Sequence, residues 1–355
     1  MIVTRAHPRR RTNRRRRARW VPPGDDRPVD DYPGVRAPDV SPMTTARPLD
    51  GLVVAVLDHD GYALTRRCAL SLRPQVDAGA TILVVDNASR EPTAEPVAAE
   101  LGRGYEALRL PVNGGVAGGY NAALRWAAAR GATHVLLLNN DTLVDDPRLG
   151  TTLLAAATAS ARVAVVGLRV LDPAGVIVSA GACLDWWRGR TRHLRTADPT
   201  GEPYPVEWVH GACMLVSVEA YRTVGGFDET FFMYCEDIDL CLRAWQHGFR
   251  CVVEPRAAIQ HVGGATVRRG QPARFILRNS LLLMRKHGST VDHAIFLVYF
   301  VARRLPVHVL RNAWPPARLR EAVGVAANAL MWNARHARAA GRWRLEGQRA
   351  RPVIR

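Results

Sequence analysis

Three carboxylates lie within four positions of this chain, directly after an aromatic run. Glu236, Asp237 and Asp239 follow the sequence Phe-Phe-Met-Tyr-Cys at 231–235. Clustered acids repel one another, so the arrangement is costly unless a cation, a helix dipole or a proton-transfer task compensates. A solvated helix cap is the ordinary alternative for an isolated pair of acids, but such caps rarely follow aromatic residues. Residues 227–243 are therefore the first candidate for a catalytic centre.

A helix is expected to begin at these acids. Leu240, Ala244 and Trp245 recur at the spacing of one apolar helical face. This spacing places Glu236 and Asp237 in the first turn, close to the helix N-terminus. The positive end of the helix dipole stabilises negative charge at that position.

The charges of the 355-residue chain are distributed unevenly, and its length allows a substantial core. Residues 1–42 carry 11 Arg and 5 acids, residues 43–267 carry 20 Arg and 24 acids, and residues 268–355 carry 17 Arg, one Lys and 3 acids. Only the two ends therefore need a polyanionic partner as an explanation. Because Lys286 is the sole lysine, the arginine excess fits a GC-rich coding bias and is weak evidence for nucleic-acid binding.

Composition divides the chain into three segments. Residues 1–48 lack apolar periodicity and are expected to be a disordered Arg-rich tail, inert or upstream of a native start at Met43. Residues 49–267 are expected to form the main domain, and residues 268–355 a basic amphipathic helical extension. The six cysteines form no Cys-x-x-Cys pair, and neither a secretory signal nor an apolar run of about 18 residues is expected. These features predict a cytoplasmic protein.

The main domain reads as an α/β fold. Apolar strands at 52–57, 81–85, 105–110 and 133–138 alternate with helical patterns at 62–72, 96–101 and 118–130. This alternation predicts a Rossmann-like, mostly parallel sheet flanked by helices. Further strands are expected at 163–166, 206–216 and 250–253, with His261 in a glycine-flanked loop. Ligands bind beyond the carboxyl ends of such strands, where Asp58, Asp86 and Asp141 fall.

Two motifs could contact a nucleotide. Asp86 follows a strand within Val-Val-Asp-Asn-Ala-Ser and could bind a nucleobase or ribose, although taken alone it fits a turn or cap better. Residues 113–121 form a glycine-rich turn into a helix that includes Asn113, Gly115 and Asn121. Such a turn allows close backbone approach and favours phosphate at the helix N-terminus. Its spacing is not the dinucleotide fingerprint, so a Rossmann dehydrogenase is not expected.

A third motif suggests a metal. Asn139-Asn140-Asp141-Thr142 places one carboxylate after a very apolar strand. Mg²⁺ and Mn²⁺ prefer oxygen ligands and often share them with substrate phosphates. One carboxylate and one imidazole could hold such a cation against a diphosphate, and His261 is the candidate imidazole. A lone histidine is more often structural, so His261 gains weight only from the other motifs.

Together these motifs resemble the family 2 glycosyltransferases. The resemblance rests on the Asp86 motif, the glycine-rich turn, Leu-Leu-Leu-Asn-Asn-Asp-Thr, the acidic stretch and the later Pro-x-Ala-x-Ile-x-His, in the family's order from about residue 52 to 261. The branch it resembles most is the rhamnosyltransferase-like and galactofuranosyltransferase-like enzymes. The resemblance implies a GT-A fold, a nucleotide-sugar donor, Mg²⁺ or Mn²⁺, inversion at the anomeric carbon and a lipid-linked or polymeric cell-surface glycan acceptor.

The resemblance also implies residue roles. Asp237 would be the general base, with Glu236 and Asp239 orienting the base or the acceptor. Asp141 and His261 would bind the metal. Donor contacts would come from Asp58, Asp86, Asn113, Gly115, Asn121, Asn140 and Asp141. The first-strand loop, Asp58-His59-Asp60-Gly61, departs from the family pattern and leaves the nucleotide contact there open.

The acceptor side and the partners are less sharply defined. Trp186, Trp187, His210, Phe232 and Tyr234 could shape the acceptor site. Apolar helical segments at 275–284 and 294–301, punctuated by arginine pairs, favour peripheral attachment to an anionic membrane surface on its inner face. The alternatives are a basic nucleic-acid-binding protein, for which no recognisable module is present, and a nucleotidyltransferase on a similar sheet.

Overall fold

A single large sheet organises the protein, for which a computed structural model describes residues 47–160, 162–198, 200–263 and 271–336. The expected tail at 1–48 lies almost wholly outside the described residues. The strand order is β10-β12-β6-β11-β4-β1-β2-β3, with β5 paired to β12 and β7 paired to β6. The bounds are β1 (Leu52–Asp58), β2 (Thr81–Asp86), β3 (Tyr105–Arg109), β4 (His134–Asn139), β5 (Thr142–Leu143), β6 (Val163–Leu171), β7 (Ile177–Ser179), β10 (Tyr204–Pro205), β11 (Cys213–Ser217) and β12 (Arg250–His261).

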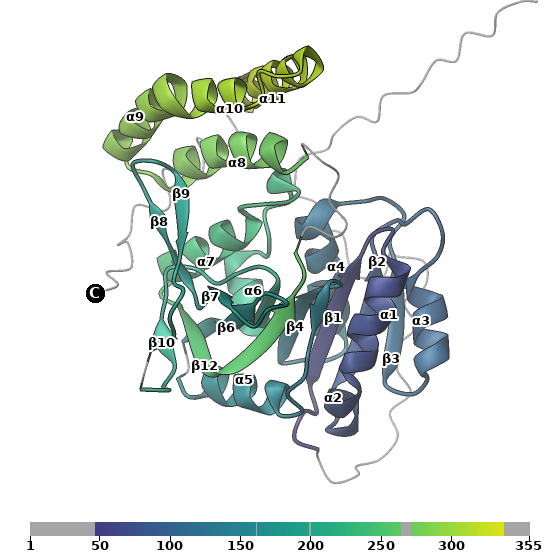
Figure 1. Ribbon diagram of the computed structural model, residues 1–355. Coiled ribbons are helices and arrows are strands. Elements are labelled where there is room, and N and C mark those ends of the chain that lie inside the picture. Colours follow the sequence, from purple (N-terminus) through teal and green to yellow (C-terminus); the bar gives the residue numbers. More distant parts are fainter. Residues whose placement is uncertain (1–46, 161, 199, 264–270, 337–355) are drawn as a thin grey trace, which may run out of the picture. The chain divides into compact units, whose positions relative to one another are not determined.

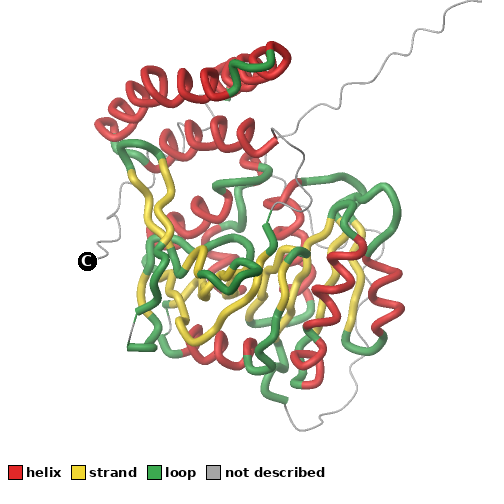
Figure 2. The backbone as a smooth tube through the Cα atoms, viewed as in Figure 1, coloured by secondary structure: helices red, strands yellow, loops and turns green. Residues whose placement is uncertain are grey.

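The pairing confirms a mostly parallel sheet. Strands β1, β2, β3 and β4 are mutually parallel, and so are β6 and β12, whereas β11 runs antiparallel between β4 and β6. A separate two-stranded hairpin consists of β8 (Ala182–Asp185) and β9 (Arg190–His193). The sheet and its flanking helices are seen in Figures 1 and 2.

Helices cover both faces of the sheet. Alternate residues of a strand point to opposite faces, so Val53 and Ala55 of β1 join one core cluster while Val54 and Val56 join the other. One face is covered by α1 (Tyr62–Ser71), α2 (Arg73–Asp77), α3 (Ala94–Leu101) and α5 (Leu149–Thr158). The other is covered by α4 (Gly115–Ala129), α6 (Val218–Val224) and α7 (Glu236–Gln246).

The strand register brings the expected polar residues to one edge. Asp58 is paired with Asp86, and Leu57 is paired with Asn139, so β1, β2 and β4 end side by side. Asp141 follows two residues after Asn139, within the turn that leads to β5. The predicted convergence of strand-end carboxylates is therefore confirmed.

Two expected strand bounds were wrong. β12 continues through His261, which is a strand residue rather than part of a loop, because β5 pairs with its end. An irregularity between Glu254 and Ala258 interrupts the apolar pattern that marks a strand in sequence. The expected strand at 206–216 is regular only from Cys213, since residues before it form a loop toward the carboxyl edge.

The C-terminal helices are longer than expected. They are α8 (Gln271–His287), α9 (Thr290–Tyr299), a π-helical segment (Phe300–Arg304), α10 (Leu305–Arg311) and α11 (Pro316–Arg335). Leu277, Leu281 and Met284 of α8 belong to the same core cluster as α7. The helical run Thr290–Arg311 is long and apolar enough to cross a membrane by length and composition, with mean hydropathy 1.3 over its best window. The expectation of no such run was wrong, because apolar residues continue on both sides of the arginine pair at 303–304.

Candidate active site

A cavity of about 1860 Å³ opens at the carboxyl edge of the sheet. Its walls come from the ends of β1, β4 and β12, the loop at 210–212, the N-terminus of α7, β9, α8 and α11. The predicted site residues that line it are Asp58, Asn113, Gly115, Asn140, Asp141, His210, Phe232, Tyr234, Glu236, Asp237 and His261. The predicted site residues that do not line it are Asp86, Asn121, Trp186, Trp187 and Asp239. The structure thus brings eleven of the sixteen together.

The backbone before α7 adopts a rare conformation. Phe232, Tyr234 and Cys235 have φ values of 65°, 66° and 72°, a region that side chains other than glycine seldom occupy. Asn279 of α8 stabilises this segment, because its Nδ2 lies 2.8 Å from the carbonyl oxygens of Phe231 and Met233 and 2.6 Å from that of Tyr234. This strained segment directs the first acids of α7 toward the cavity. Backbone strain of this kind is typical of functional sites.

Asp237 is held firmly at the cavity wall. Its Oδ1 accepts a hydrogen bond from the backbone N–H of Ile238 at 2.8 Å, and its Oδ2 accepts one from that of Gly211 at 3.0 Å. Burial nevertheless raises the pKa of Asp237 to about 6. The group is therefore ionised at neutral pH and basic enough to accept a proton.

Glu236 differs from its neighbour in charge state. Burial, followed by the nearby charge of Asp237, raises the pKa of Glu236 well above its ordinary value. Its Oε2 is buried and has no hydrogen-bond partner among the described residues. Two adjacent carboxyl groups with separated pKa values are typical of an acid and base pair. We infer that Glu236 is protonated while Asp237 is ionised.

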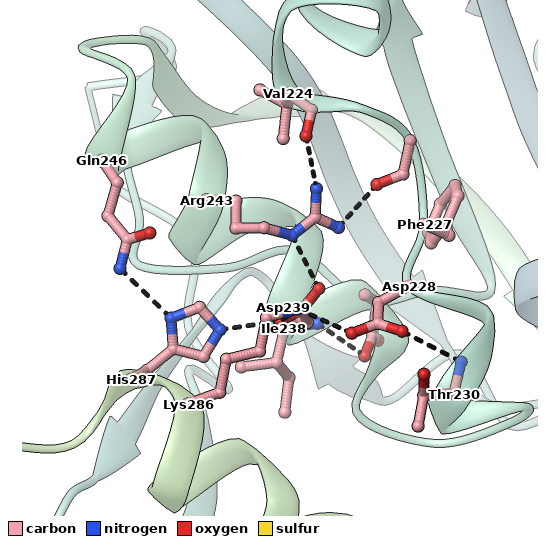
Figure 3. A network of polar contacts seen from close by, with 12 residues as sticks. Val224, Phe227, Asp228, Thr230, Ile238, Asp239, Arg243, Gln246, Lys286 and His287 are labelled. Carbon is pink, nitrogen blue, oxygen red and sulfur yellow. Dashed lines mark hydrogen bonds and ion pairs between the residues drawn. The ribbon is translucent and has the colours of Figure 1, made fainter. Parts of the chain in front are cut away.

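Asp239 points away from the cavity, which corrects its predicted place beside the reacting groups. It is fully buried, and Figure 3 shows it surrounded by cationic and histidine side chains. Its Oδ2 lies 2.8 Å from Nε of Arg243, and its Oδ1 lies 2.7 Å from Nζ of Lys286 and 2.8 Å from Nε2 of His287. Burial opposes ionisation, but these three residues outweigh it and hold the pKa of Asp239 well below its usual range.

This network joins α7 to α8 and to the loop before α7. Arg243 also donates to the carbonyl oxygen of Val224 at 2.8 Å, and Lys286 lies 2.8 Å from Oδ2 of Asp228. Nε2 of Gln246 also lies 3.2 Å from Nδ1 of His287, as Figure 3 shows. Sequence reasoning missed Lys286 and His287, although the sole lysine of the chain was a signal that could have been followed.

The glycine-rich turn is fixed by side-chain amides. Asn87 donates to the carbonyl oxygen of Gly115 at 2.9 Å and accepts from the N–H of Gly114 at 3.0 Å. Asn121, predicted to bind the donor, is instead buried and hydrogen-bonded to the backbone of Phe227. Its side chain donates to the Phe227 carbonyl oxygen at 2.9 Å and accepts from the Phe227 N–H at 2.8 Å. Its role is therefore to join α4 to the loop before α7.

The strand-end carboxylates organise loops. Asp86 is fully buried and accepts from the N–H of Ser89 at 2.7 Å and from Arg109 at 3.1 Å, so its predicted nucleobase contact is not available to a ligand in the cavity. Asp58 is equally buried and accepts from Asn140 at 2.7 Å and from Thr65 at 2.6 Å. The predicted donor residues Asn113, Gly115, Asn140 and Asp141 still line the cavity, and so do His59, Asn87 and Arg90, which were not singled out in the sequence.

A candidate cation site lies at the end of β12. Because Thr142 pairs with His261, Asp141 is brought close, and its Oδ1 lies 3.1 Å from Nε2 of His261. This Nε2 is buried and forms no hydrogen bond of good geometry with the described residues. An imidazole nitrogen and a carboxylate oxygen directed at each other fit a shared Mg²⁺ or Mn²⁺. The described residues contain no group of three histidine, cysteine or acidic side chains around one point, so any further ligands would come from substrate or water.

A row of three histidine rings extends from the Asp141–His261 pair to His193 at the end of β9. The ring of His210 lies 5.7 Å from that of His261 and 5.5 Å from that of His193. Burial, followed by these two histidines, lowers the pKa of His210 to about 3, so it stays neutral. The predicted acceptor tryptophans lie elsewhere: Trp186 donates to Glu207 at 3.0 Å, and Trp187 is exposed outside the cavity.

Comparison with known proteins identifies the family. Residues 134–334 match Glycosyl transferase family group 2, and the chain belongs to this family of sugar-transferring enzymes. An N-acetylglucosaminyl-diphospho-decaprenol L-rhamnosyltransferase of Mycobacterium tuberculosis is 29% identical over 236 residues, which are 59% of this chain and 75% of that protein. The rhamnosyltransferase WbbL of Escherichia coli is 53% identical over 45 residues, which are 13% of this chain and 17% of that protein.

A solved structure shows the same fold. The crystal structure of GalNAc-T7 with UDP, GalNAc and Mn²⁺ has a TM-score of 0.52 and 14% identity, covering 75% of this chain and 58% of that one. The predicted GT-A fold is therefore confirmed, and the family supports the glycosyltransferase interpretation of the motifs.

Proposed function

We propose that this protein is an inverting, metal-dependent hexosyltransferase that moves a sugar from a nucleotide sugar to a lipid-linked glycan. The observation that carries the proposal is the cavity itself, which holds the candidate base Asp237 together with the Asp141–His261 pair. A base and a site for a leaving diphosphate on one cavity are what a single in-line displacement requires. The named rhamnosyltransferase relatives favour a rhamnose-like donor, with a galactofuranose-like donor next.

In this mechanism Asp237 takes the proton of the acceptor hydroxyl. The hydroxyl oxygen forms a bond to the anomeric carbon as the bond between that carbon and the diphosphate oxygen breaks. The N–H groups of Gly211 and Ile238 keep the carboxylate in place. Protonated Glu236 adds no negative charge beside the attacking oxygen.

Asp141 and His261 would hold the divalent cation. When bound, such a cation neutralises charge on the departing nucleoside diphosphate. The GalNAc-T7 structure, which contains UDP and Mn²⁺, supports a divalent cation without choosing between Mg²⁺ and Mn²⁺. Neutral His210 lies beside His261 and could donate to or accept from substrate without adding charge.

We place the enzyme peripherally on the inner face of an anionic membrane. Phe296 and Phe300 bury one face of the run Thr290–Arg311 against the protein, while Val298 and Val301 on its other face are 70% and 57% exposed. A helix with one protein-bound face and exposed apolar residues suits a position along the membrane surface. Exposed Arg303 beside this face would attract anionic lipids.

The catalytic assignment is tested with Asp237→Asn. This variant keeps the shape of the side chain but cannot take a proton, so turnover should fall by about 10²–10⁴-fold. Donor binding, measured by calorimetry with dTDP-rhamnose and UDP-galactofuranose plus Mn²⁺, should remain. Asp185→Asn, at an acid outside the cavity, is the matched control. Undiminished turnover by Asp237→Asn would refute the assignment.

The membrane placement is tested separately with Val298→Asp. Flotation with vesicles containing phosphatidylglycerol should decrease for this variant relative to the unaltered protein. Leu70→Asp is the control, because Leu70 is an exposed apolar residue of α1. Equal loss of flotation in both variants would contradict the assignment of the surface to α9.

A further inference from the structure

A second charged region lies on the same cavity, away from the Asp141–His261 pair. Arg190 of β9, Arg274 of α8 and Arg304 of the π-helical segment all line the cavity that contains Asp237. No described carboxylate forms an ion pair with any of the three, although exposed Glu321 also lines this part. Uncompensated arginines that converge on a cavity favour an anionic ligand.

Arg304 is the most constrained of these residues. Its Nη1 donates to the carbonyl oxygen of Gly189 at 3.2 Å, which directs the guanidinium toward the turn before Arg190. Burial, with the like charge of Arg190 contributing, lowers the pKa of Arg304, although arginine remains charged. The local cost of two neighbouring cations would be offset by a bound phosphate group.

The position of Arg190 separates this region from the candidate cation site. β9 begins at Arg190 and ends at His193. The ring of His193 contacts the ring of His210, which in turn contacts the ring of His261. The three strand residues from Arg190 to His193 span about 10 Å. Arg190 therefore lies at one end of the row formed by β9 and the three histidines, and the Asp141–His261 pair lies at the other. Such a spacing leaves room for sugar residues between two phosphate groups, one belonging to the donor and the other to the acceptor.

We propose that Arg190 and Arg304 bind the diphosphate of the lipid-linked acceptor, with Arg274 at the rim. This inference rests on the proposed function and names the chemical group by which that acceptor is held. Guanidinium groups bind phosphate oxygens in pairs. Arg304 also belongs to the helical run whose outer face exposes Val298 and Val301, so the lipid chain could continue from the diphosphate toward the membrane.

The first test measures binding without turnover. Geranylgeranyl diphosphate should bind the full-length protein in detergent, and geranylgeraniol should bind much more weakly. Arg190→Gln and Arg304→Gln should each weaken diphosphate binding by roughly tenfold or more, and Arg304→Lys should restore it only in part. Arg188→Gln is the matched control, because Arg188 lies in the same hairpin but outside the cavity. Equal binding of all variants would overturn the inference.

The second test distinguishes the two sources of diphosphate. In steady-state assays, Arg190→Gln and Arg304→Gln should raise KM for the lipid acceptor with little change in the calorimetric Kd of the nucleotide sugar. Weakened donor binding with an unchanged acceptor KM would instead assign the cluster to the donor and refute the proposal. If the unaltered protein binds geranylgeranyl diphosphate through these arginines yet transfers no sugar, the inference stands and the proposed function fails.

Discussion

Replacing Lys286 by Met tests how strongly the buried network between α7 and α8 stabilises the fold. Nζ of Lys286 contacts two carboxylates, Asp239 at 2.7 Å and Asp228 at 2.8 Å, and the residue is 5% exposed. Removing one partner of a buried ion pair costs about 3–5 kcal/mol, because a buried charge loses its compensation. Since Arg243 and His287 still contact Asp239, we expect about 3 kcal/mol. At about 1.5 °C per kcal/mol for a chain of this size, the melting midpoint should fall by about 4–5 °C.

The assay is urea and thermal unfolding followed by tryptophan fluorescence. Arg66→Met serves as the control, because Arg66 pairs with Glu100 at the exposed surface and its loss should change the midpoint little. The depressed pKa of Asp239 adds a pH signature: its stabilisation is complete above the unfolded pKa near 4 and is lost as pH falls below it. This acid-side loss should be smaller in Lys286→Met. Identical midpoints for the two variants would refute the reasoning.

Two further predictions concern the site and its supporting turn. The pKa of Asp237 is about 6 and the base acts ionised, so kcat/KM should fall as pH drops through about 6; an acid limb near pH 4 would contradict the assignment. Gly115→Ala should destabilise the protein and weaken donor binding more than Gly131→Ala, measured by urea unfolding and calorimetry. Both glycines have positive φ, but a Cβ at 115 would collide with the carbonyl of Phe232 whereas one at 131 meets open space; equal effects would refute the role of this close approach.

The elements from β1 to β4 were predictable because their signals are local. Apolar runs such as 52–57 and 133–138 are short, uninterrupted and bounded by polar turn residues, so the positions and ends of these strands follow from the chain. β12 was harder, because the charged residues Glu254 and Arg256 interrupt its pattern and pair with each other at 2.7 Å. The continuation of the strand depends on pairing with β5 and β6, which are distant in sequence.

The roles of the strand-end acids could not be derived in the same way. Asp86 and Asp141 each follow an apolar strand, and in sequence they look alike. Neighbours far along the chain separate them. Arg109 and Ser89 enclose Asp86, whereas His261 faces Asp141 from β12. Burial by distant elements therefore decides which acid is left for a ligand.

Neighbours far along the chain likewise divide the acids of α7 into three states. Glu236 is buried and pairs with no cation among the described residues, and burial together with the charge of Asp237 raises its pKa well above its ordinary value. Asp237 accepts hydrogen bonds from two backbone N–H groups and remains a weakly basic carboxylate that lines the cavity. Asp239 lies two residues further, facing the opposite side, where Arg243 and Lys286 keep it ionised. Burial sets the raised pKa of Asp237, and the helix α8 that fixes Asp239 also supports, through Asn279, the turn before Asp237.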